Sequence, residues 1–167
     1  FSLVYGKAVI AACACSGHGL PGAFMAMMGK DLLNQIITDN KVTSPSIAPT
    51  VLDQKVQAAL NRGNQSEQQD GMDVALCAFD LQALTVDYAG AYRPLLIVRD
   101  DTVIEYKATK RSIGSDFNQS KPFQEEQIDL LAGDCIYLIT DGYVDQYGGK
   151  DNKKCRLRQF KELILKI

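Results

Sequence analysis

Apolar and polar positions follow two different spacings along this chain, and the first is that of a strand. Small and β-branched residues follow one another over 7–15 and stop at the glycine-rich stretch 16–19. A short apolar run bounded by glycines is typical of a buried strand. We therefore predict a strand over 7–15 that is buried on both faces.

A helical spacing follows this strand. Pro21 stands where the first turn of a helix readily accepts proline, and Asp39-Asn40 is expected to end the helix. The apolar residues between them are Phe24, Met25, Met27, Met28, Leu32, Leu33, Ile36 and Ile37. A stripe this wide predicts a helix over 22–37 that packs on more than one side.

A second helix is predicted from Ser46, a plausible N-cap, to about Arg62. Its inward residues are expected to be Ile47, Val51, Val56 and Leu60. The polar stretch 63–71 has no periodicity and is predicted to be a mobile loop.

The remaining chain alternates as strands do, and it ends in a helix. The predicted strands are 74–79, 85–89, 94–99, 102–107, 127–130 and 135–140. Asp100-Asp101 has the spacing of a tight hairpin turn. The final helix starts near Leu157, with Phe160, Leu163, Ile164 and Ile167 on one face. This order predicts a layered α+β domain with helices covering sheet faces.

Composition narrows the class of protein. A length of 167 residues predicts one domain, and a net charge of −2 argues against nucleic-acid binding. Residues 150–161 carry six basic residues and are expected to be a solvated surface. The five cysteines are expected to be reduced thiols, because their number is odd and their spacing irregular. No apolar run is long enough to cross a bilayer. The chain begins at Phe1, so we expect a domain truncated at both ends.

Asp141 is the strongest candidate for chemistry. It follows the predicted strand 135–140, and Gly142 lets the backbone turn beside it. A carboxylate fixed at a strand end suits Mg²⁺ or Mn²⁺, which prefer rigidly held oxygen ligands. The alternative is an Asp that simply opens a turn.

The turn at 16–19 is the second candidate. Backbone N–H groups at the start of a helix can hold an anion such as phosphate, so Gly17 and His18 are candidate substrate-binding residues. His18 can also have a purely structural role, in which it pins the loop by a hydrogen bond. Cys13 and Cys15 lack the further ligands of a zinc site.

Four segments, in collinear order, resemble a known family. Residues 11–28 are similar to the first metal-site motif of SpoIIE-type PPM phosphatases, Ala-Asp-Cys-Thr-Gly-His-Gly-Val-Pro-Gly-Ala-Phe-Met. Residues 70–77 and 89–95 resemble strands of the same domains, and 134–149 resembles the second metal-site motif. The resemblance extends from about residue 8 to residue 167.

The resemblance implies a fold and a mechanism. The fold would be an α-β-β-α sandwich of two antiparallel sheets flanked by helices. Two Mn²⁺ or Mg²⁺ ions would activate a bridging water that attacks a phosphoserine or phosphothreonine. Asp141 would be the catalytic metal ligand and the carbonyl of Cys15 would bind the second metal. His18 does not align cleanly with the histidine of the eukaryotic enzymes, so it is not assigned a general-acid role.

The chain departs from the family at its metal ligands. The bridging Asp falls on Ala14, whose methyl group cannot bind a cation. Two further carboxylate motifs would lie before residue 1 and after residue 167. We therefore expect metal binding to be weakened or lost and the domain to be inactive. Ala14 is either an introduced replacement or the mark of a natural pseudophosphatase, which binds a phosphoprotein or acts as a scaffold.

The resemblance also suggests partners and a location. The substrate would be a phosphorylated switch protein of bacterial signalling, such as an anti-sigma-factor antagonist. The domain would be cytoplasmic, would follow a sensor module in a parent protein that is sometimes membrane-anchored, and could form a homodimer.

Overall fold

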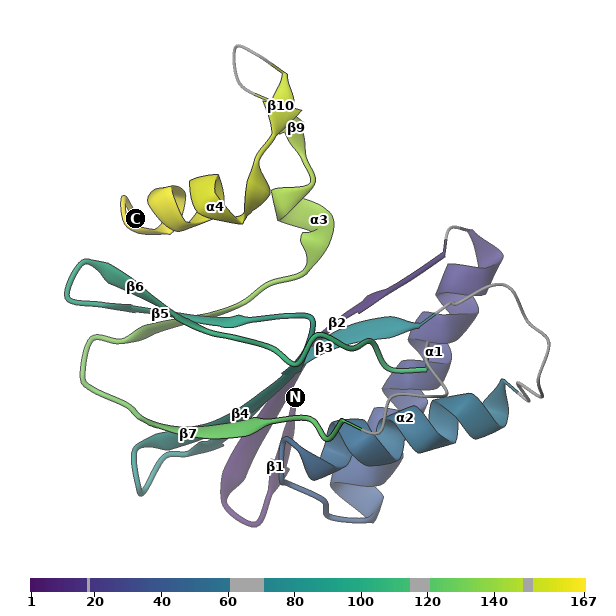
Figure 1. Cartoon of the computed structure of the whole chain (residues 1–167). Helices are drawn as coiled ribbons and strands as arrows, with labels where there is room; N and C mark the ends of the chain where they lie inside the picture. Colours follow the sequence, from purple (N-terminus) through teal and green to yellow (C-terminus); the bar gives the residue numbers. More distant parts are fainter. Residues whose placement is uncertain (18, 61–70, 115–120, 149–151) are drawn as a thin grey trace.

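The computed structural model describes residues 1–17, 19–60, 71–114, 121–148 and 152–167. Two antiparallel sheets stack face to face, with helices α1 and α2 outside one sheet and α4 outside the other (Figure 1). The predicted α-β-β-α sandwich is therefore confirmed. Three apolar clusters fill the spaces between these layers.

The larger sheet has five strands in the order β1-β2-β3-β4-β7. Its strands are β1 (Ser2–Val4), β2 (Lys7–Cys15), β3 (Met72–Asp80), β4 (Thr85–Ala91) and β7 (Glu125–Asp129). The central strand β3 is the apolar run that we predicted, and residues 74–78 are buried. Strand β1 was not predicted, because three residues are too few for a period to show.

One face of this sheet is covered by α1 (Leu20–Asn34), which continues as a π-helical segment, η1 (Gln35–Asp39), and by α2 (Ile47–Ala59). Ile36, Leu52 and Val56 are fully buried against the sheet residues Val74 and Leu76. The helix predicted over 22–37 thus ends as expected at Asp39-Asn40. No helix among the described residues has both the length and the apolar character needed to cross a membrane.

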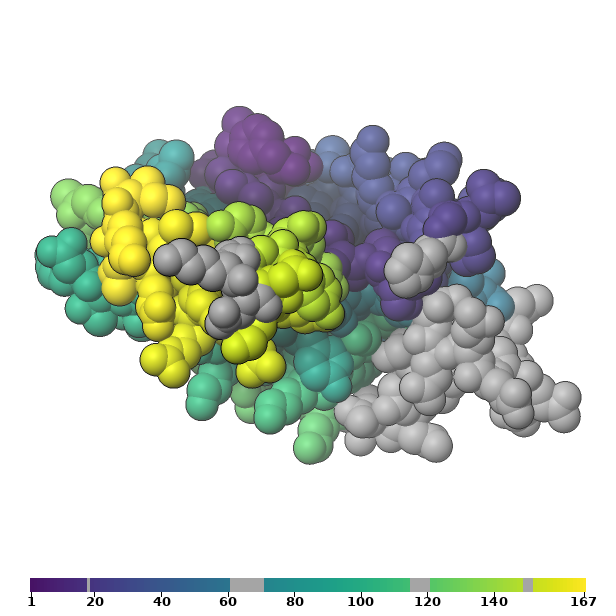
Figure 2. All heavy atoms as spheres, turned by 90° about the horizontal axis from the view of Figure 1, so that it is seen from above, coloured from purple at the N-terminus to yellow at the C-terminus, as the bar shows by residue number. Residues whose placement is uncertain are grey.

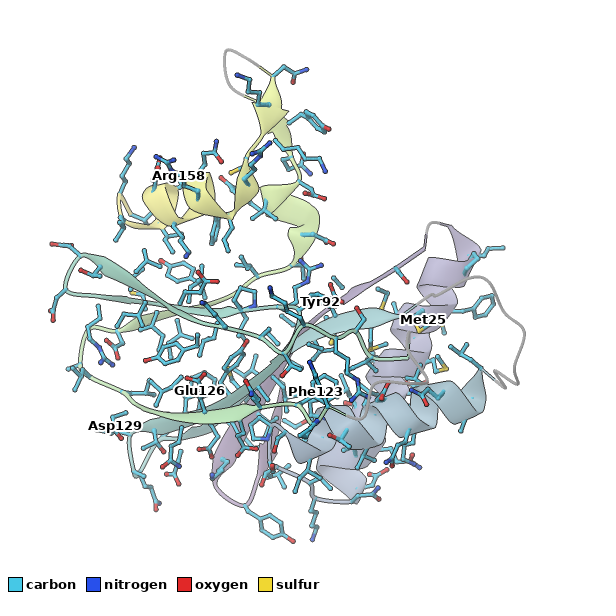
Figure 3. All side chains as sticks on the ribbon, viewed as in Figure 1. Met25, Tyr92, Phe123, Glu126, Asp129 and Arg158 are labelled. Carbon is cyan, nitrogen blue, oxygen red and sulfur yellow. The ribbon has the colours of Figure 1, made fainter. Side chains whose placement is uncertain are left out.

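One burial prediction for this region was wrong. Strand β2 is not buried on both faces, since Val9 is 2% exposed but Ile10 is 36% exposed. Helix α1 packs against both β2 and α2, as its wide apolar stripe predicted, and Met25, Gly29 and Leu33 are buried. Figure 3 shows Met25 on this helix. The stripe is wider than these contacts, because Phe24 and Met27 are more than 60% exposed.

The start of α2 is fixed by a carboxylate from the sheet. Ser46 occupies the predicted N-cap position, but its hydroxyl makes no capping bond. Glu125 instead accepts hydrogen bonds from the Ser46 N–H at 2.9 Å and from the hydroxyls of Ser44 and Ser46. A negative charge at a helix N-terminus is stabilising. Ile47, predicted to point inward, is 54% exposed.

A buried ion pair attaches α2 to residues 111–114, which follow strand β6 (Thr102–Tyr106). Asp53 and Arg111 are bonded to each other, and their side chains are 5% and 9% exposed. Asp53 also accepts the Gly114 N–H at 2.6 Å. The Arg111 guanidinium lies 4.8 Å from the ring centre of Phe123, which Figure 3 shows near α2. These contacts hold residues 111–114 against helix α2.

The smaller sheet has the order β6-β5-β8, from β5 (Leu95–Arg99), β6 (Thr102–Tyr106) and β8 (Cys135–Leu138). The predicted tight hairpin between β5 and β6 is confirmed, since Asp100 and Asp101 have φ of 46° and 57°, as type I′ turns require. Burial between the two sheets raises the pKa of the Cys77 thiol to about 12.

The C-terminal segment contains a short helix α3 (Asp141–Val144), a small hairpin of β9 (Tyr147–Gly148) and β10 (Lys153–Lys154), and α4 (Arg156–Ile164). Phe160 and Ile164 of α4 pack on the smaller sheet as predicted. Leu163 and Ile167, predicted on the same face, are 39% and 92% exposed. The helix ends at Ile164, so the helical spacing no longer applies to residue 167.

Replacing Asp134 by Asn should weaken the fold in a pH-dependent way. Both oxygens of Asp134 accept hydrogen bonds from Arg99, at 2.8 and 2.6 Å, and this pairing lowers the pKa of the carboxyl. A lowered folded-state pKa stabilises the protein above the unfolded pKa of about 3.9, and the stabilisation is lost as pH falls through the folded value. Urea unfolding from pH 3 to 7 should show a difference between Asp134→Asn and the unchanged chain that shrinks in acid. The exposed Asp129→Asn is the control.

Candidate metal centre

The candidate residues converge at one end of the sheets, in a pocket of about 180 Å³. Ala14, Cys15, Ser16, Gly71, Asp73, Arg93, Ser112 and Asp141 line it. Figure 2 views the molecule from above, with the yellow-green segment around α3 in front and purple spheres of the N-terminal part of the chain next to it. The lining therefore combines the ends of strands that lie far apart in the sequence.

Pairing of β2 with β3 sets the floor of the pocket. In this antiparallel register Ala14 lies opposite Asp73 and Cys15 lies opposite Met72. Just beyond the pair, the Gly71 N–H donates to the Ser16 hydroxyl at 2.6 Å. Ser16 N–H donates in return to the Gly71 carbonyl at 2.9 Å. These bonds continue the ladder, so the backbone around Ala14 is held in a fixed place.

Asp141 reaches the pocket from the smaller sheet. It follows β8 and is the first residue of α3, and its side chain is 52% exposed. The Asp145 N–H donates to the Asp141 carbonyl at 2.8 Å, which closes the turn behind the carboxylate. The carboxylate is thus presented at a strand end, as its position in the sequence predicted.

Arg93 joins the two acidic residues. Its Nη2 donates to Asp73 Oδ2 at 2.9 Å and to Asp141 Oδ2 at 2.8 Å. The backbone of Arg93 is fixed from below, because the buried Tyr88 hydroxyl donates to the Arg93 carbonyl at 2.6 Å. Gly90 leaves the space for this bond, since a Cβ there would lie 2.2 Å from the Tyr88 oxygen.

The segment after β6 completes the pocket through Ser112. Met72 and Ile113 exchange both backbone hydrogen bonds, at 2.9 and 2.8 Å, which fixes this segment beside β3. The Ser112 hydroxyl then donates to Asp73 Oδ1 at 2.5 Å. One oxygen of Asp73, Oδ1, therefore accepts from Ser112, and the other, Oδ2, accepts from Arg93.

The structure brings most of the predicted site residues together. Asp141, Ala14 and Cys15 line the same pocket. Gly17 has a φ of 95°, which favours glycine, and it lies next to the lining residue Ser16 without lining the pocket itself. His18 lies outside the described residues, so its predicted substrate contact stays a prediction.

Sequence reasoning missed Asp73, Arg93 and Ser112. The segments 70–77 and 89–95 had been matched to the family as strands, and their polar side chains were not assigned a role. The available signal was the position of Asp73, an acidic residue directly before the predicted strand 74–79. The register itself becomes visible only in the folded sheet.

The donor set fits a divalent cation in part. The carboxylate residues Asp73 and Asp141 line the pocket, and carboxylates are oxygen ligands of the kind that Mg²⁺ and Mn²⁺ prefer. A cationic group, the Arg93 guanidinium, already bridges the carboxylates. Among the residues that the structure describes, no group of three or more His, Cys, Asp or Glu side chains could hold a metal.

A second pocket, of about 260 Å³, lies between β2 and α1. Its lining is mainly small and apolar, with Val9, Ala11, Leu33 and Met72 among the lining residues, and it contains no carboxylate. Although it is larger, its lining includes no carboxylate to neutralise a hard cation, and it includes the cationic Lys30. The smaller pocket is therefore the candidate site.

Comparisons with known proteins identify the family and the fold of this chain. A family model described as stage II sporulation protein E (SpoIIE) matches residues 5–166. The SiaA-PP2C domain of Pseudomonas aeruginosa is 25% identical, with a TM-score of 0.79 over 96% of this chain. The PP2C phosphatase domain of SpoIIE from Bacillus subtilis, solved with a fragment of its regulatory domain, is 19% identical, with a TM-score of 0.70 over 99% of this chain.

A more distant match is the serine/threonine phosphatase PstP/Ppp of Mycobacterium tuberculosis, 12% identical, with a TM-score of 0.61 over 88% of this chain. The present chain covers 65% of the SiaA chain, 49% of the SpoIIE chain and 76% of the PstP/Ppp chain. No curated protein matches the sequence.

Proposed function

Because the chain belongs to the SpoIIE family of PP2C-type, metal-dependent phosphatases, we propose that it is a protein serine/threonine phosphatase domain whose activity is blocked at position 14. The observation that supports this most is the shared pocket of Ala14, Cys15 and Asp141. An alanine methyl group there stands next to the residues that would hold metal. Within residues 1–167, the proposed ligand that is lost by substitution is the one at position 14.

Two Mn²⁺ or Mg²⁺ ions are the proposed cofactors, with Asp141 and the Cys15 carbonyl as ligands. When bound, such ions activate water for attack on a phosphoryl group and stabilise the charge that develops. Ala14 cannot contribute a shared ligand, so the proposed site binds metal weakly in this chain. Gly17 and the other backbone N–H groups of the turn before α1 would hold the substrate phosphate.

The proposed substrate is a phosphoserine or phosphothreonine protein of bacterial signalling, such as an anti-sigma-factor antagonist. Support comes from relatives described as a cell fate determinant and as part of the stressosome system. A cytoplasmic location, an upstream sensor domain and a possible homodimer belong to the same proposal. The net charge of −2 argues against a nucleic-acid partner.

Ala14→Asp, made in a full-length domain that includes the two flanking carboxylate motifs, tests this proposal. The restored carboxylate would face Asp73 across the strands and lie in the pocket with Asp141. We expect the variant to release phosphate from a phosphoserine peptide or para-nitrophenyl phosphate when Mn²⁺ is present, and the unchanged chain to release none. The matched control is Ala12→Asp, two residues earlier on the same strand face. If Ala14→Asp neither binds Mn²⁺ by calorimetry nor turns over substrate, the proposal is wrong.

A pseudophosphatase is the second candidate, and the Arg93 bridge favours it. A guanidinium between Asp73 and Asp141 keeps both carboxylates paired without metal. This candidate predicts that the unchanged chain binds a phosphoprotein without cleaving it. A phosphopeptide that binds the unchanged chain as well as it binds Ala14→Asp, without hydrolysis by either protein, would favour it.

A further inference from the structure

We propose that Asp73 supplies the metal centre with a carboxylate in place of the one that position 14 lacks, and that Arg93 occupies the cation position until metal displaces it. This inference rests on the proposed function, since it concerns the same site. It adds a ligand from the facing strand, and it predicts that one divalent cation can bind this chain while Ala14 is retained.

The strand register is the first argument. Residues directly opposite in an antiparallel pair project to the same face of the sheet, with Cβ atoms about 5 Å apart. Ala14 and Asp73 are such a pair. A carboxylate on Asp73 therefore enters the space that a longer side chain at position 14 would share. Asp73 lines the pocket, and its side chain is only 21% exposed.

The orientation of Asp73 is the second argument. Ser112 donates to Oδ1 of this carboxylate at 2.5 Å, which leaves Oδ2 as the oxygen that faces the pocket. The same Oδ2 atom and Asp141 Oδ2 both lie within 2.9 Å of one nitrogen, Arg93 Nη2. Two carboxylate oxygens that converge on one positively charged point are arranged as ligands of a single cation.

The charge of the guanidinium is the third argument. Arg93 brings one positive charge to two carboxylates, so the group retains a net negative charge that a divalent ion would neutralise. Arg93 is also incompletely satisfied, because its Nε is buried without a hydrogen-bond partner. An unpaired buried donor is costly. Release of Arg93 to solvent would remove that cost, which makes the guanidinium a displaceable occupant.

The test measures Mn²⁺ binding to the chain with Ala14 retained, by calorimetry and by electron paramagnetic resonance of the bound ion. Removal of the competing charge in Arg93→Met should tighten binding of one Mn²⁺ by about 10-fold or more. The double variant Arg93→Met with Asp73→Asn should lose that gain. Arg158→Met is the matched control, because Arg158 is 89% exposed on α4 and points away from the sheet (Figure 3).

Two results would overturn the inference. One is an Arg93→Met protein that binds Mn²⁺ no more tightly than the unchanged chain. The other is a double variant that keeps the full gain, which would mean that Asp73 is not a ligand. If Arg93→Met does not fold, as judged by its circular dichroism, Arg93→Gln replaces it with the same expected gain. Phosphate release by Ala14→Asp is measured separately, so a failed phosphatase assay leaves the Mn²⁺ result interpretable.

Discussion

Asp141→Asn, made in the Ala14→Asp protein, is expected to lower kcat/KM for para-nitrophenyl phosphate by about 1,000-fold or more. A bound metal is worth several kcal/mol of transition-state stabilisation, and about 4 kcal/mol corresponds to that factor. An amide oxygen at position 141 carries no charge, so it holds a divalent cation far less well. The fold should change little, because the Asp141 side chain is 52% exposed.

The matched control for this variant is Asp145→Asn, four residues further on. Asp145 is similarly exposed and pairs with Lys154 at 3.3 Å, outside the pocket. Rates are measured across a range of Mn²⁺ concentrations. An Asp141→Asn protein that keeps near-normal turnover at every concentration would rule out Asp141 as a metal ligand.

Gly90→Ala is expected to destabilise the protein by about 3 kcal/mol. An added Cβ would lie 2.2 Å from the Tyr88 hydroxyl and 2.4 Å from the Arg93 carbonyl, so the bond between these two groups must break. Overpacking costs about 1–3 kcal/mol, and a buried donor left unpaired adds a comparable amount. Urea unfolding measures the loss directly.

Gly148→Ala is the control for this second variant. A Cβ at Gly148 would meet no atom within 4 Å, so this change should shift the unfolding free energy by less than about 1 kcal/mol. A Gly90→Ala protein as stable as Gly148→Ala would mean that the Tyr88–Arg93 bond does not hold Arg93 in place.

The sequence predicted the strands and the order of layers well, because each long strand carries its own apolar pattern. Strand β3 is the best example, with Val74 and Leu76 buried toward the helices and Ala75 and Cys77 buried toward the second sheet. Helix α1 was harder to predict. Its apolar residues surround the helix, but only the sides that face β2 and α2 are covered, so the spacing alone overestimated how much of the helix would be buried.

Only some residues of the candidate site could be predicted from the sequence. Asp141 and Ala14 lie in motifs whose residue types could be compared position by position with a known family. Asp73 and Arg93 acquire their meaning from pairing across strands and from a turn held by Tyr88. Contacts of this kind join residues that are distant in sequence, so the local spacing of apolar residues does not predict them.

The buried pair of Asp53 and Arg111 limits how this sequence can diverge. The two residues lie 58 positions apart in the sequence and form an ion pair with each other. Their side chains are only 5% and 9% exposed. Loss of either one leaves a buried charge unpaired, at a cost of about 3–5 kcal/mol, whereas replacement of both by well-packed apolar residues is often neutral. In relatives with the same packing, positions 53 and 111 should therefore change together, and single changes at either should be rare.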